Sequence, residues 1–193
     1  MESAKETLRR AMRARRAALD DAASASAGAR IAALLRPLAI VRKAKVLVAY
    51  LARGNEVSTD AVIAEAAQRG QAVFVPETQR NWFIRYDVDS PSNGPMEASE
   101  AWLAAEERSG LILVPLLAWT PQGDRLGRGG GWYDRVLPRL RIPTIGVAYE
   151  FQRREHVPTE PTDVRLDYVV TEDRLIECGR VPSGRRLFVE GGK

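Results

Sequence analysis

The sequence predicts an α/β domain with a mainly parallel central sheet that helices cover on both faces. Predicted strands and helices alternate along the chain, which is the pattern of α/β folds. Most of the predicted strands are continuous apolar runs, as expected for strands that are buried on both faces. The chain has 193 residues, the length of one ordinary domain. No boundary divides it, so we expect residues 1–193 to form a single domain.

Two helices are predicted ahead of the first strand. The first covers residues 3–19, and Ser3 and Glu6 have the S-x-x-E spacing of a capping box at its start. The second is rich in alanine, covers residues 22–36 and ends before Pro37, because proline cannot continue a helix. We therefore expect N-terminal helices over about residues 3–36.

Short apolar runs and turn residues place the remaining elements. The runs that predict strands are residues 45–52, 72–76, 82–89, 110–118, 143–149 and 167–171. Helices are predicted from Ser58 or Thr59 to Arg69, around residues 100–108, and from Trp132 to Leu140. From about residue 179 the chain is polar, and we expect this tail to be loose.

The composition excludes several kinds of chemistry. The net charge is a mild +4, and 28% of the residues are charged, as in an ordinary globular protein. A single cysteine, Cys178, cannot form an internal disulfide. A single histidine, His156, excludes a zinc site built from several histidines. We expect Cys178 to be a small buried or incidental residue and His156 to lie on the surface.

The sequence contains neither a membrane-spanning run nor a secretory signal. No stretch approaches the roughly 18 apolar residues that a membrane helix needs. The N-terminal residues are charged throughout and lack the apolar segment of a signal peptide. We therefore expect a soluble cytoplasmic protein.

The most informative segment is the glycine-rich loop from Gly123 to Arg135. It lies between the strongest predicted strand and a predicted helix, where α/β proteins bind phosphates. Glycines let backbone N–H groups approach an anion, and arginines add forked donors for phosphate oxygens. These residues are Gly127, Gly129, Gly130, Gly131, Arg125 and Arg128. Asp134 follows in the first turn of the predicted helix, where a carboxylate beside phosphates suits Mg²⁺.

Other interpretations of this loop remain open. A glycine cluster can be a flexible turn, and Asp134 can simply interact with the helix dipole. Neither common nucleotide motif is present: Trp132 stands where a Rossmann motif needs glycine, and the ending of a Walker A motif is missing. The two arginines within the run favour the phosphate interpretation.

Five segments together point to a known family. The first is RLGRGGGWYD at residues 125–134, with Val114-Pro115 before it and IGVAYEFQ after it. The others are KETLR at residues 5–9, YLARGNEVST at 50–59, VFVPE at 73–77 and VPTEPTDVRLDYVVTE at 157–172. With these segments, the chain resembles the 5-formyltetrahydrofolate cyclo-ligase family, also called 5,10-methenyltetrahydrofolate synthetases, over most of its length.

The resemblance implies a three-layer α/β sandwich and an ATP- and Mg²⁺-dependent ligase of one-carbon metabolism. In the implied reaction, ATP phosphorylates the formyl oxygen of 5-formyltetrahydrofolate, which gives an N5 iminium phosphate. N10 then attacks, and the products are 5,10-methenyltetrahydrofolate, ADP and phosphate. Phosphoryl transfer depends mainly on positioning and charge neutralisation, so it does not require a nucleophilic side chain.

The resemblance also implies roles for individual residues. The implied ATP contacts are Lys5, Arg9, Arg125, Leu126, Gly127, Arg128, Gly129, Gly130, Gly131, Trp132 and Tyr133. The implied folate contacts are Leu51, Glu56, Arg128, Trp132 and Tyr133. Asp134 and Asp163 are the implied magnesium ligands, and Asp167 is the alternative to Asp163. Arg128 and Asp134 are the implied catalytic residues.

Two departures from the family pattern leave other functions open. Trp132 replaces the first of two tyrosines, and Trp119-Thr120 replaces the usual Phe-Asp. These changes are compatible with a related protein that acts on a different substrate, and the basic first helix with a nucleic-acid-binding protein. The near balance of acidic and basic side chains argues against nucleic acid. We expect ATP and 5-formyltetrahydrofolate as ligands, with neither nucleic acid nor membrane as a partner. The sequence does not predict an oligomeric state.

Overall fold

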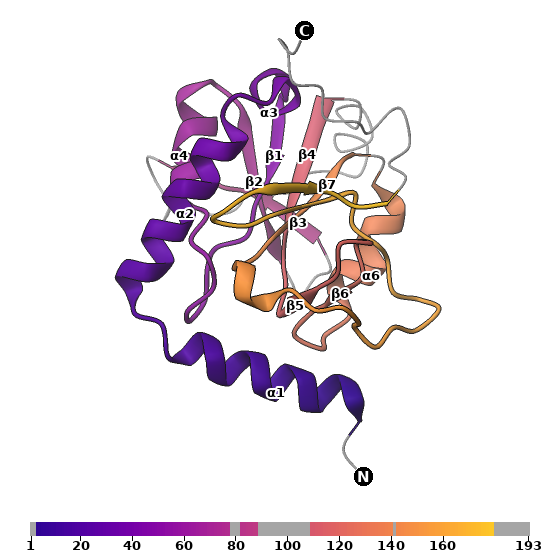
Figure 1. Cartoon of the computed structure of the whole chain (residues 1–193). Helices are drawn as coiled ribbons and strands as arrows, with labels where there is room; N and C mark the ends of the chain where they lie inside the picture. Colours follow the sequence, from indigo (N-terminus) through magenta and orange to yellow (C-terminus); the bar gives the residue numbers. More distant parts are fainter. Residues whose placement is uncertain (1–2, 78–81, 89–108, 141, 180–193) are drawn as a thin grey trace, which may run out of the picture.

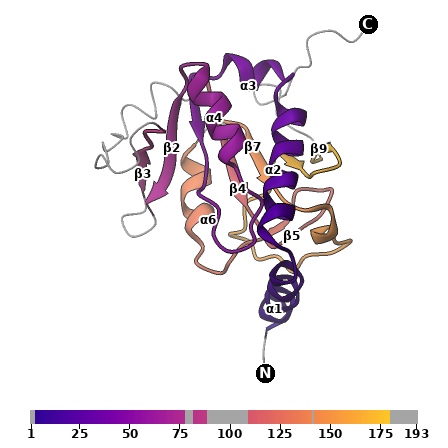
Figure 2. The same ribbon diagram turned by 90° about the vertical axis from the view of Figure 1, so that its left-hand side faces the viewer.

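The structure is a computed structural model that describes residues 3–77, 82–88, 109–140 and 142–179. Within these ranges the chain forms the predicted α/β fold, with a central sheet and helices on both faces (Figures 1 and 2). The helix expected around residues 100–108 lies outside the described residues, as does the tail from residue 180.

The strands of the described residues form a seven-stranded sheet in the order β3-β2-β1-β4-β7-β8-β9. Their bounds are β1 Val46–Val48, β2 Ala72–Glu77, β3 Trp82–Arg85, β4 Gly110–Pro115, β7 Thr144–Val147, β8 Tyr168–Val170 and β9 Leu175–Glu177. The five inner strands pair in parallel, and β3 and β9 pair antiparallel at the two edges. The prediction of a mainly parallel sheet is therefore confirmed.

The apolar runs supply both cores of the molecule because successive side chains of a strand point to opposite faces. On β1, Leu47 packs into one core, and Val46 and Val48 pack into the other. The same alternation holds on β4, where Leu111 faces the first core and Ile112 the second. Strands with two buried faces read as continuous apolar runs, which is why the sequence identified them.

One predicted strand is divided in two. The run 110–118 leaves the sheet at Pro115, the last residue of β4, because proline has no N–H for the ladder. The chain then forms a small hairpin, in which β5 (Ala118–Trp119) pairs antiparallel with β6 (Arg125–Leu126). This hairpin leads directly into the glycine-rich loop.

Helices cover both faces of the sheet (Figure 2). On one face lie α2 (Asp21–Leu35), α3 (Ala39–Lys43) and α4 (Asp60–Gln68). On the other lies α6 (Trp132–Val136), which continues as the 3-10 helix η2 (Leu137–Arg139). The predicted helix 132–140 is therefore α-helical only at its start, because Pro138 cannot donate the next helical hydrogen bond. A second 3-10 helix, η3 (Glu150–Gln152), follows β7.

The first helix, α1 (Ala4–Ala17), lies outside these layers, beside the β5–β6 hairpin (Figure 1). It begins as predicted, because the Ser3 hydroxyl accepts a hydrogen bond from the Glu6 N–H at 3.2 Å. Met12 anchors it: this side chain is 2% exposed and packs among Leu117, Ala118, Leu126 and Val157. Of the helices that the structure describes, none is both long and apolar enough to span a membrane.

Candidate active site

A pocket of about 960 Å³ opens between α1, the glycine-rich loop and the segment before β8. Pro115, at the carboxyl end of β4, lies in its wall, which is where parallel sheets assemble their sites. The other lining residues are Ser3, Lys5, Arg9, Arg53, residues 125–135 of the loop and α6, Glu160, Thr162 and Asp163. All eleven residues that the sequence assigns to ATP line this pocket.

The glycine-rich loop is held from one side by α1. Arg9 Nε donates to the Gly127 carbonyl oxygen at 3.1 Å, and Arg13 Nη2 donates to the Arg128 carbonyl oxygen at 3.0 Å. Gly129 and Gly131 have φ of 106° and 62°, a region in which side chains are strained. These glycines let the chain turn sharply from β6 into α6, which brings its backbone to the pocket.

Arg125 and Asp134, which both line the pocket, form a partly buried ion pair. Arg125 Nη2 lies 2.7 Å from Asp134 Oδ1, and its Nη1 donates to the Val164 carbonyl oxygen. The Val164 N–H in turn donates to Asp134 Oδ1 at 3.2 Å. Burial lowers the pKa of Arg125, although the Asp134 carboxylate opposes that shift. The guanidinium of Arg125 therefore fixes Asp134 and ties it to the segment that carries Asp163.

Lys5 and Asp163 form a second ion pair across the pocket mouth. Lys5 Nζ lies 2.7 Å from Asp163 Oδ2 and 3.1 Å from Glu160 Oε1. Burial alone would lower the pKa of Lys5, but its hydrogen bonds to Asp163 and Glu160 raise it overall. The pKa of Asp163 is lowered, because the Lys5 and Glu160 N–H hydrogen bonds outweigh its burial. Lys5 is thus a fully charged group at neutral pH.

The two carboxylates fit a magnesium ion that also binds phosphate. Among the described residues, the hydrogen bonds to Asp134 end on Oδ1 and those to Asp163 end on Oδ2. Each carboxylate therefore keeps one oxygen for a cation. Within the same residues, no group of three His, Cys, Asp or Glu side chains could hold a metal. A magnesium ion here would need phosphate oxygens and water to complete its six ligands.

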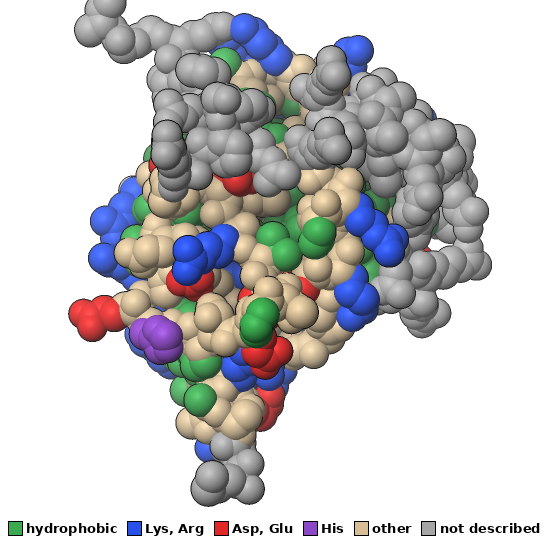
Figure 3. Space-filling model, turned by 90° about the vertical axis from the view of Figure 1, so that its right-hand side faces the viewer, with side chains coloured by type: hydrophobic (Ala, Val, Ile, Leu, Met, Phe, Trp, Pro, Cys, Tyr) green, Lys and Arg blue, Asp and Glu red, His purple; other side chains and the backbone are tan. Residues whose placement is uncertain are grey.

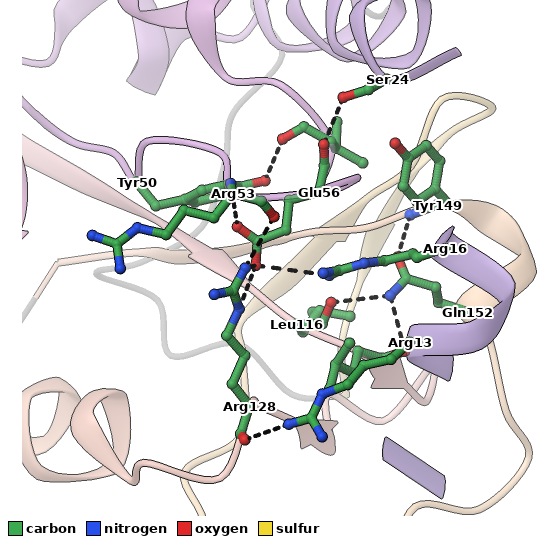
Figure 4. Close-up of polar contacts among 12 residues, drawn as sticks. Arg13, Arg16, Ser24, Tyr50, Arg53, Glu56, Leu116, Arg128, Tyr149 and Gln152 are labelled. Carbon is green, nitrogen blue, oxygen red and sulfur yellow. Dashed lines mark hydrogen bonds and ion pairs between the residues drawn. The ribbon is translucent and has the colours of Figure 1, made fainter. Parts of the chain in front are cut away.

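Glu56 forms a separate polar cluster behind the loop (Figure 4). It is 5% exposed, and its Oε1 lies 2.8 Å from Arg128 Nη2 and 3.7 Å from Arg16 Nη1. Its Oε2 accepts a hydrogen bond from the Arg53 N–H at 3.0 Å. Glu56 and Leu51 do not line the pocket described above. Arg128 joins the two places, because it both lines the pocket and pairs with Glu56.

The structure distinguishes Asp163 from its alternative, Asp167. Asp167 is buried beside β7, where its Oδ2 accepts from the Thr144 N–H at 2.9 Å and from the Thr144 hydroxyl at 2.8 Å. It does not line the pocket, whereas Asp163 does. Asp167 therefore stabilises the fold, and of the two aspartates Asp163 is the one that lies at the pocket.

Both departures from the family pattern are accommodated by packing. Trp132 is buried edge-to-face against Phe83 and Tyr133, with ring centroids 5.2 Å and 4.8 Å away. Thr120 donates to Asp124 Oδ2 at 3.1 Å, which closes the turn between β5 and β6. Thr120, which stands where the family pattern has an aspartate, thus makes a hydrogen bond within this turn.

The remaining candidate groups for catalysis lie away from the pocket. Cys178 is buried, and burial raises the pKa of its thiol to about 12, which excludes a nucleophilic thiolate. His156 is exposed, and it lies on the surface in Figure 3. Both expectations for these residues are confirmed.

Sequence reasoning missed several polar residues that complete the site. Arg53, Glu160 and Thr162 line the pocket, and all three lie within segments quoted for the family resemblance. Arg16 contacts Glu56, but on a helix rich in arginine nothing in its spacing separates it from its neighbours. Only the tertiary structure shows that Arg16 is the buried arginine of α1.

Comparisons with known proteins identify the family of the chain. The sequence model of the 5-formyltetrahydrofolate cyclo-ligase family matches residues 1–172. The 5-formyltetrahydrofolate cyclo-ligase of Haemophilus influenzae is 33% identical over 141 residues, which cover 65% of this chain and 74% of that protein. The protein of the same name from Escherichia coli K12 is 27% identical over 180 residues, 86% of this chain and 99% of that protein.

A solved structure shares the fold. The NMR structure of Aquifex aeolicus 5,10-methenyltetrahydrofolate synthetase has a TM-score of 0.77 and 25% identity. The match covers 94% of this chain and 96% of that one. The resemblance inferred from the glycine-rich loop and its companion segments is confirmed. The chain belongs to the 5-formyltetrahydrofolate cyclo-ligase family, a family of ligases.

Proposed function

We propose that this protein closes the ring of 5-formyltetrahydrofolate to give 5,10-methenyltetrahydrofolate, with ATP as co-substrate and Mg²⁺ as cofactor. Family membership supports the cyclo-ligase activity. The observation that carries the ATP-dependent step is the pocket itself, where a glycine-rich loop, cationic side chains and two carboxylates surround one space.

The proposed reaction has two steps. The formyl oxygen attacks the γ-phosphorus of ATP, ADP leaves, and the substrate becomes an N5 iminium phosphate. N10 then attacks the activated carbon, the C–O bond to phosphate breaks, and loss of the N10 proton gives the methenyl product. Neither step needs a nucleophilic side chain, which agrees with the remote positions of Cys178 and His156.

The nucleotide would bind with its phosphates against the loop from Gly127 to Gly131. Four of these five residues are glycines, so the backbone can approach the phosphates closely, and Lys5 and Arg9 supply positive charge from α1. Asp134 and Asp163 would hold magnesium through their remaining oxygens. When bound, the ion would neutralise charge on the transferring phosphoryl group.

The folate would bind with its pterin ring at Glu56. A reduced pterin presents a ring N–H and an amine side by side, and a carboxylate accepts both. Leu51, the exposed large apolar residue of the described chain at 41% exposure, lies on the same loop after β1 and offers an apolar contact. Arg128 lies between Glu56 and the nucleotide pocket, so it is placed to contact both substrates.

The test is direct assembly of the reaction. Purified protein, ATP, Mg²⁺ and 5-formyltetrahydrofolate are mixed, and the methenyl chromophore is followed by absorbance while ADP is measured. We expect both products in equal amounts, and neither without ATP. No chromophore in the complete mixture would overturn the proposal. Nucleotide binding without turnover would instead point to a related protein with another substrate.

A further inference from the structure

Arg16 is a buried cation at the centre of the Glu56 cluster. Its side chain is 10% exposed, and its Nη1 lies 3.7 Å from Glu56 Oε1. Its Nε is buried and has no hydrogen-bond partner among the described residues. An arginine is rarely buried without a full set of partners, because desolvation of its charge is costly. An arginine kept in this position needs an explanation.

We propose that Arg16 is a positioning residue for the folate site: it keeps the buried Glu56 carboxylate in place when Arg128 leaves Glu56 to contact a substrate. The inference rests on the proposed pterin contact of Glu56. It adds to that function a residue that contacts neither substrate.

The two arginines beside Glu56 differ in their freedom to leave it. The Arg128 side chain is 46% exposed and comes from the glycine-rich loop. Arg16 comes from the interior of a 14-residue helix and is buried. An incoming pterin therefore displaces Arg128, and Arg16 stays. Loss of both cations would leave a buried carboxylate uncompensated, which is strongly unfavourable.

The backbone around Glu56 is fixed without Arg16. The Ser24 hydroxyl donates to the Glu56 carbonyl oxygen at 2.6 Å, and the Tyr50 hydroxyl donates to the Val57 carbonyl oxygen at 2.8 Å. The Arg53 N–H holds Glu56 Oε2. Arg16 therefore acts on the carboxylate oxygen Oε1 of Glu56, while the path of the loop does not depend on Arg16. Figure 4 shows Arg16 and Arg128 reaching the carboxylate from different elements.

One helix thereby serves both ends of the proposed site. Lys5 and Arg9 lie at the nucleotide pocket, and Arg16 lies at Glu56. An α-helix rises about 1.5 Å per residue, so Lys5 and Arg16 lie roughly 16 Å apart along the axis of α1. Because α1 is anchored by Met12 between them, it sets the spacing between the nucleotide pocket and the folate carboxylate.

The experiment is a double-mutant cycle on binding. Folate and ATP dissociation constants are measured by titration for wild type, Arg16→Met, Glu56→Gln and the double variant. In Arg16→Met, displacement of Arg128 by folate leaves Glu56 without either of its two arginine partners. We expect about tenfold weaker folate binding, with ATP affinity within about twofold. In the Glu56→Gln background, Arg16→Met should add less than about twofold.

Two further variants keep the test decisive. Arg16→Lys retains the charge, and we expect it to recover at least half of the lost affinity on a logarithmic scale. Arg15→Met removes the neighbouring exposed arginine, which stacks on Phe151, and should leave folate binding unchanged. Thermal unfolding verifies that each variant is folded. If Arg16→Met fails to fold, Arg16→Lys and its combination with Glu56→Gln complete the cycle.

The outcomes separate this inference from the proposed function. Intact folate binding in Glu56→Gln would overturn the pterin contact itself. Weak binding in Glu56→Gln together with full affinity in Arg16→Met would overturn only the role of Arg16. An equal loss in both backgrounds would also overturn it, since Arg16 would then act independently of Glu56.

Discussion

Lys5 Nζ lies 2.7 Å from Asp163 Oδ2, although 158 residues separate them in the sequence. This ion pair joins the first helix to the segment before β8 and closes one side of the proposed nucleotide pocket. Asp163 is also a proposed magnesium ligand, so the same side chain contributes to the stability of the fold and to the proposed nucleotide pocket.

The Lys5–Asp163 pair predicts a specific loss of stability in acid. The folded pKa of Asp163 lies below its ordinary value of 3.8, so its ionised form stabilises the fold above that pH. This contribution disappears as the pH falls through the folded pKa. We expect Asp163→Asn to be less stable than wild type near neutral pH, with the difference shrinking as the pH falls below 3.8 and through the lowered pKa of Asp163. Urea unfolding at several pH values measures it.

A matched control variant distinguishes the effect of the Lys5–Asp163 ion pair on stability from the effect of removing any one negative charge. Asp173→Asn removes an exposed carboxylate that pairs with Arg30, both about half exposed. Its unfolding free energy should differ little from wild type at any pH, because exposed pairs contribute little. A constant difference between Asp163→Asn and wild type across the acid range would contradict the assignment.

Asp134→Asn should separate magnesium binding from folding. The amide has a similar shape but is a poorer magnesium ligand, and it still accepts from Arg125 and the Val164 N–H. We expect a fold close to wild type and a turnover lower by roughly 10- to 100-fold. Magnesium titration of turnover at fixed ATP measures the change, and a chelator should abolish wild-type turnover. Activity that survives the chelator would exclude the magnesium role.

Gly131→Ala tests the turn that carries the loop into α6. Gly131 has φ of 62°, and an added Cβ would lie 3.1 Å from Arg135 Nη1. The left-handed conformation costs a side chain about 1–2 kcal/mol, so we expect a loss of unfolding free energy of that size. Gly130→Ala is the control, because its φ is not positive and nothing lies within 4 Å of its added Cβ. Equal stability of the two variants in denaturant unfolding would refute this account.

Arg128→Lys tests the forked donor. Both Nε and Nη2 of Arg128 lie within 2.9 Å of Glu56 Oε1, and Nη2 also donates to the Arg53 carbonyl oxygen at 3.1 Å. A lysine keeps the charge but cannot reproduce the fork. We expect the KM for ATP to rise roughly tenfold. Arg139→Lys, at an exposed position of η2, should leave it unchanged. An unaltered KM for ATP in Arg128→Lys would show that Arg128 contacts Glu56 but does not bind ATP.

The sequence predicted the parallel sheet because its strands are buried on both faces. The start of the first helix was also predictable, since the Ser3 hydroxyl accepts a hydrogen bond from the N–H group three residues later. The lengths of the strands were not predictable, because burial continues through Ala49 and Tyr50 after β1 ends at Val48. The short elements α3 and β9 carry too few residues for a periodic signal.

From residue types alone, the site was predictable only in the loop, where its residues are adjacent in sequence; Lys5, Arg9 and Asp163 were assigned from the family resemblance. The loop from Arg125 to Asp134 forms one local structure, so its motif located the pocket. Pairings between distant segments, such as Arg16 with Glu56, depend on where the fold places a whole helix. The residue types predicted that charged side chains gather at the site. Only the tertiary structure shows that Arg125 forms an ion pair with Asp134 and that Arg128 forms one with Glu56.

The anchoring of α1 has a consequence for synthesis of the chain on the ribosome. The helix emerges early, but the apolar partners of Met12 run from Leu117 to Val157, and the ion-pair partner of Lys5 is Asp163. A nascent chain that has not yet extended past Asp163 therefore has no complete pocket, even when β1, β2 and β4 have already been translated. The proposed ATP site therefore forms only after Asp163 has been translated, and shorter nascent chains do not bind nucleotide through it.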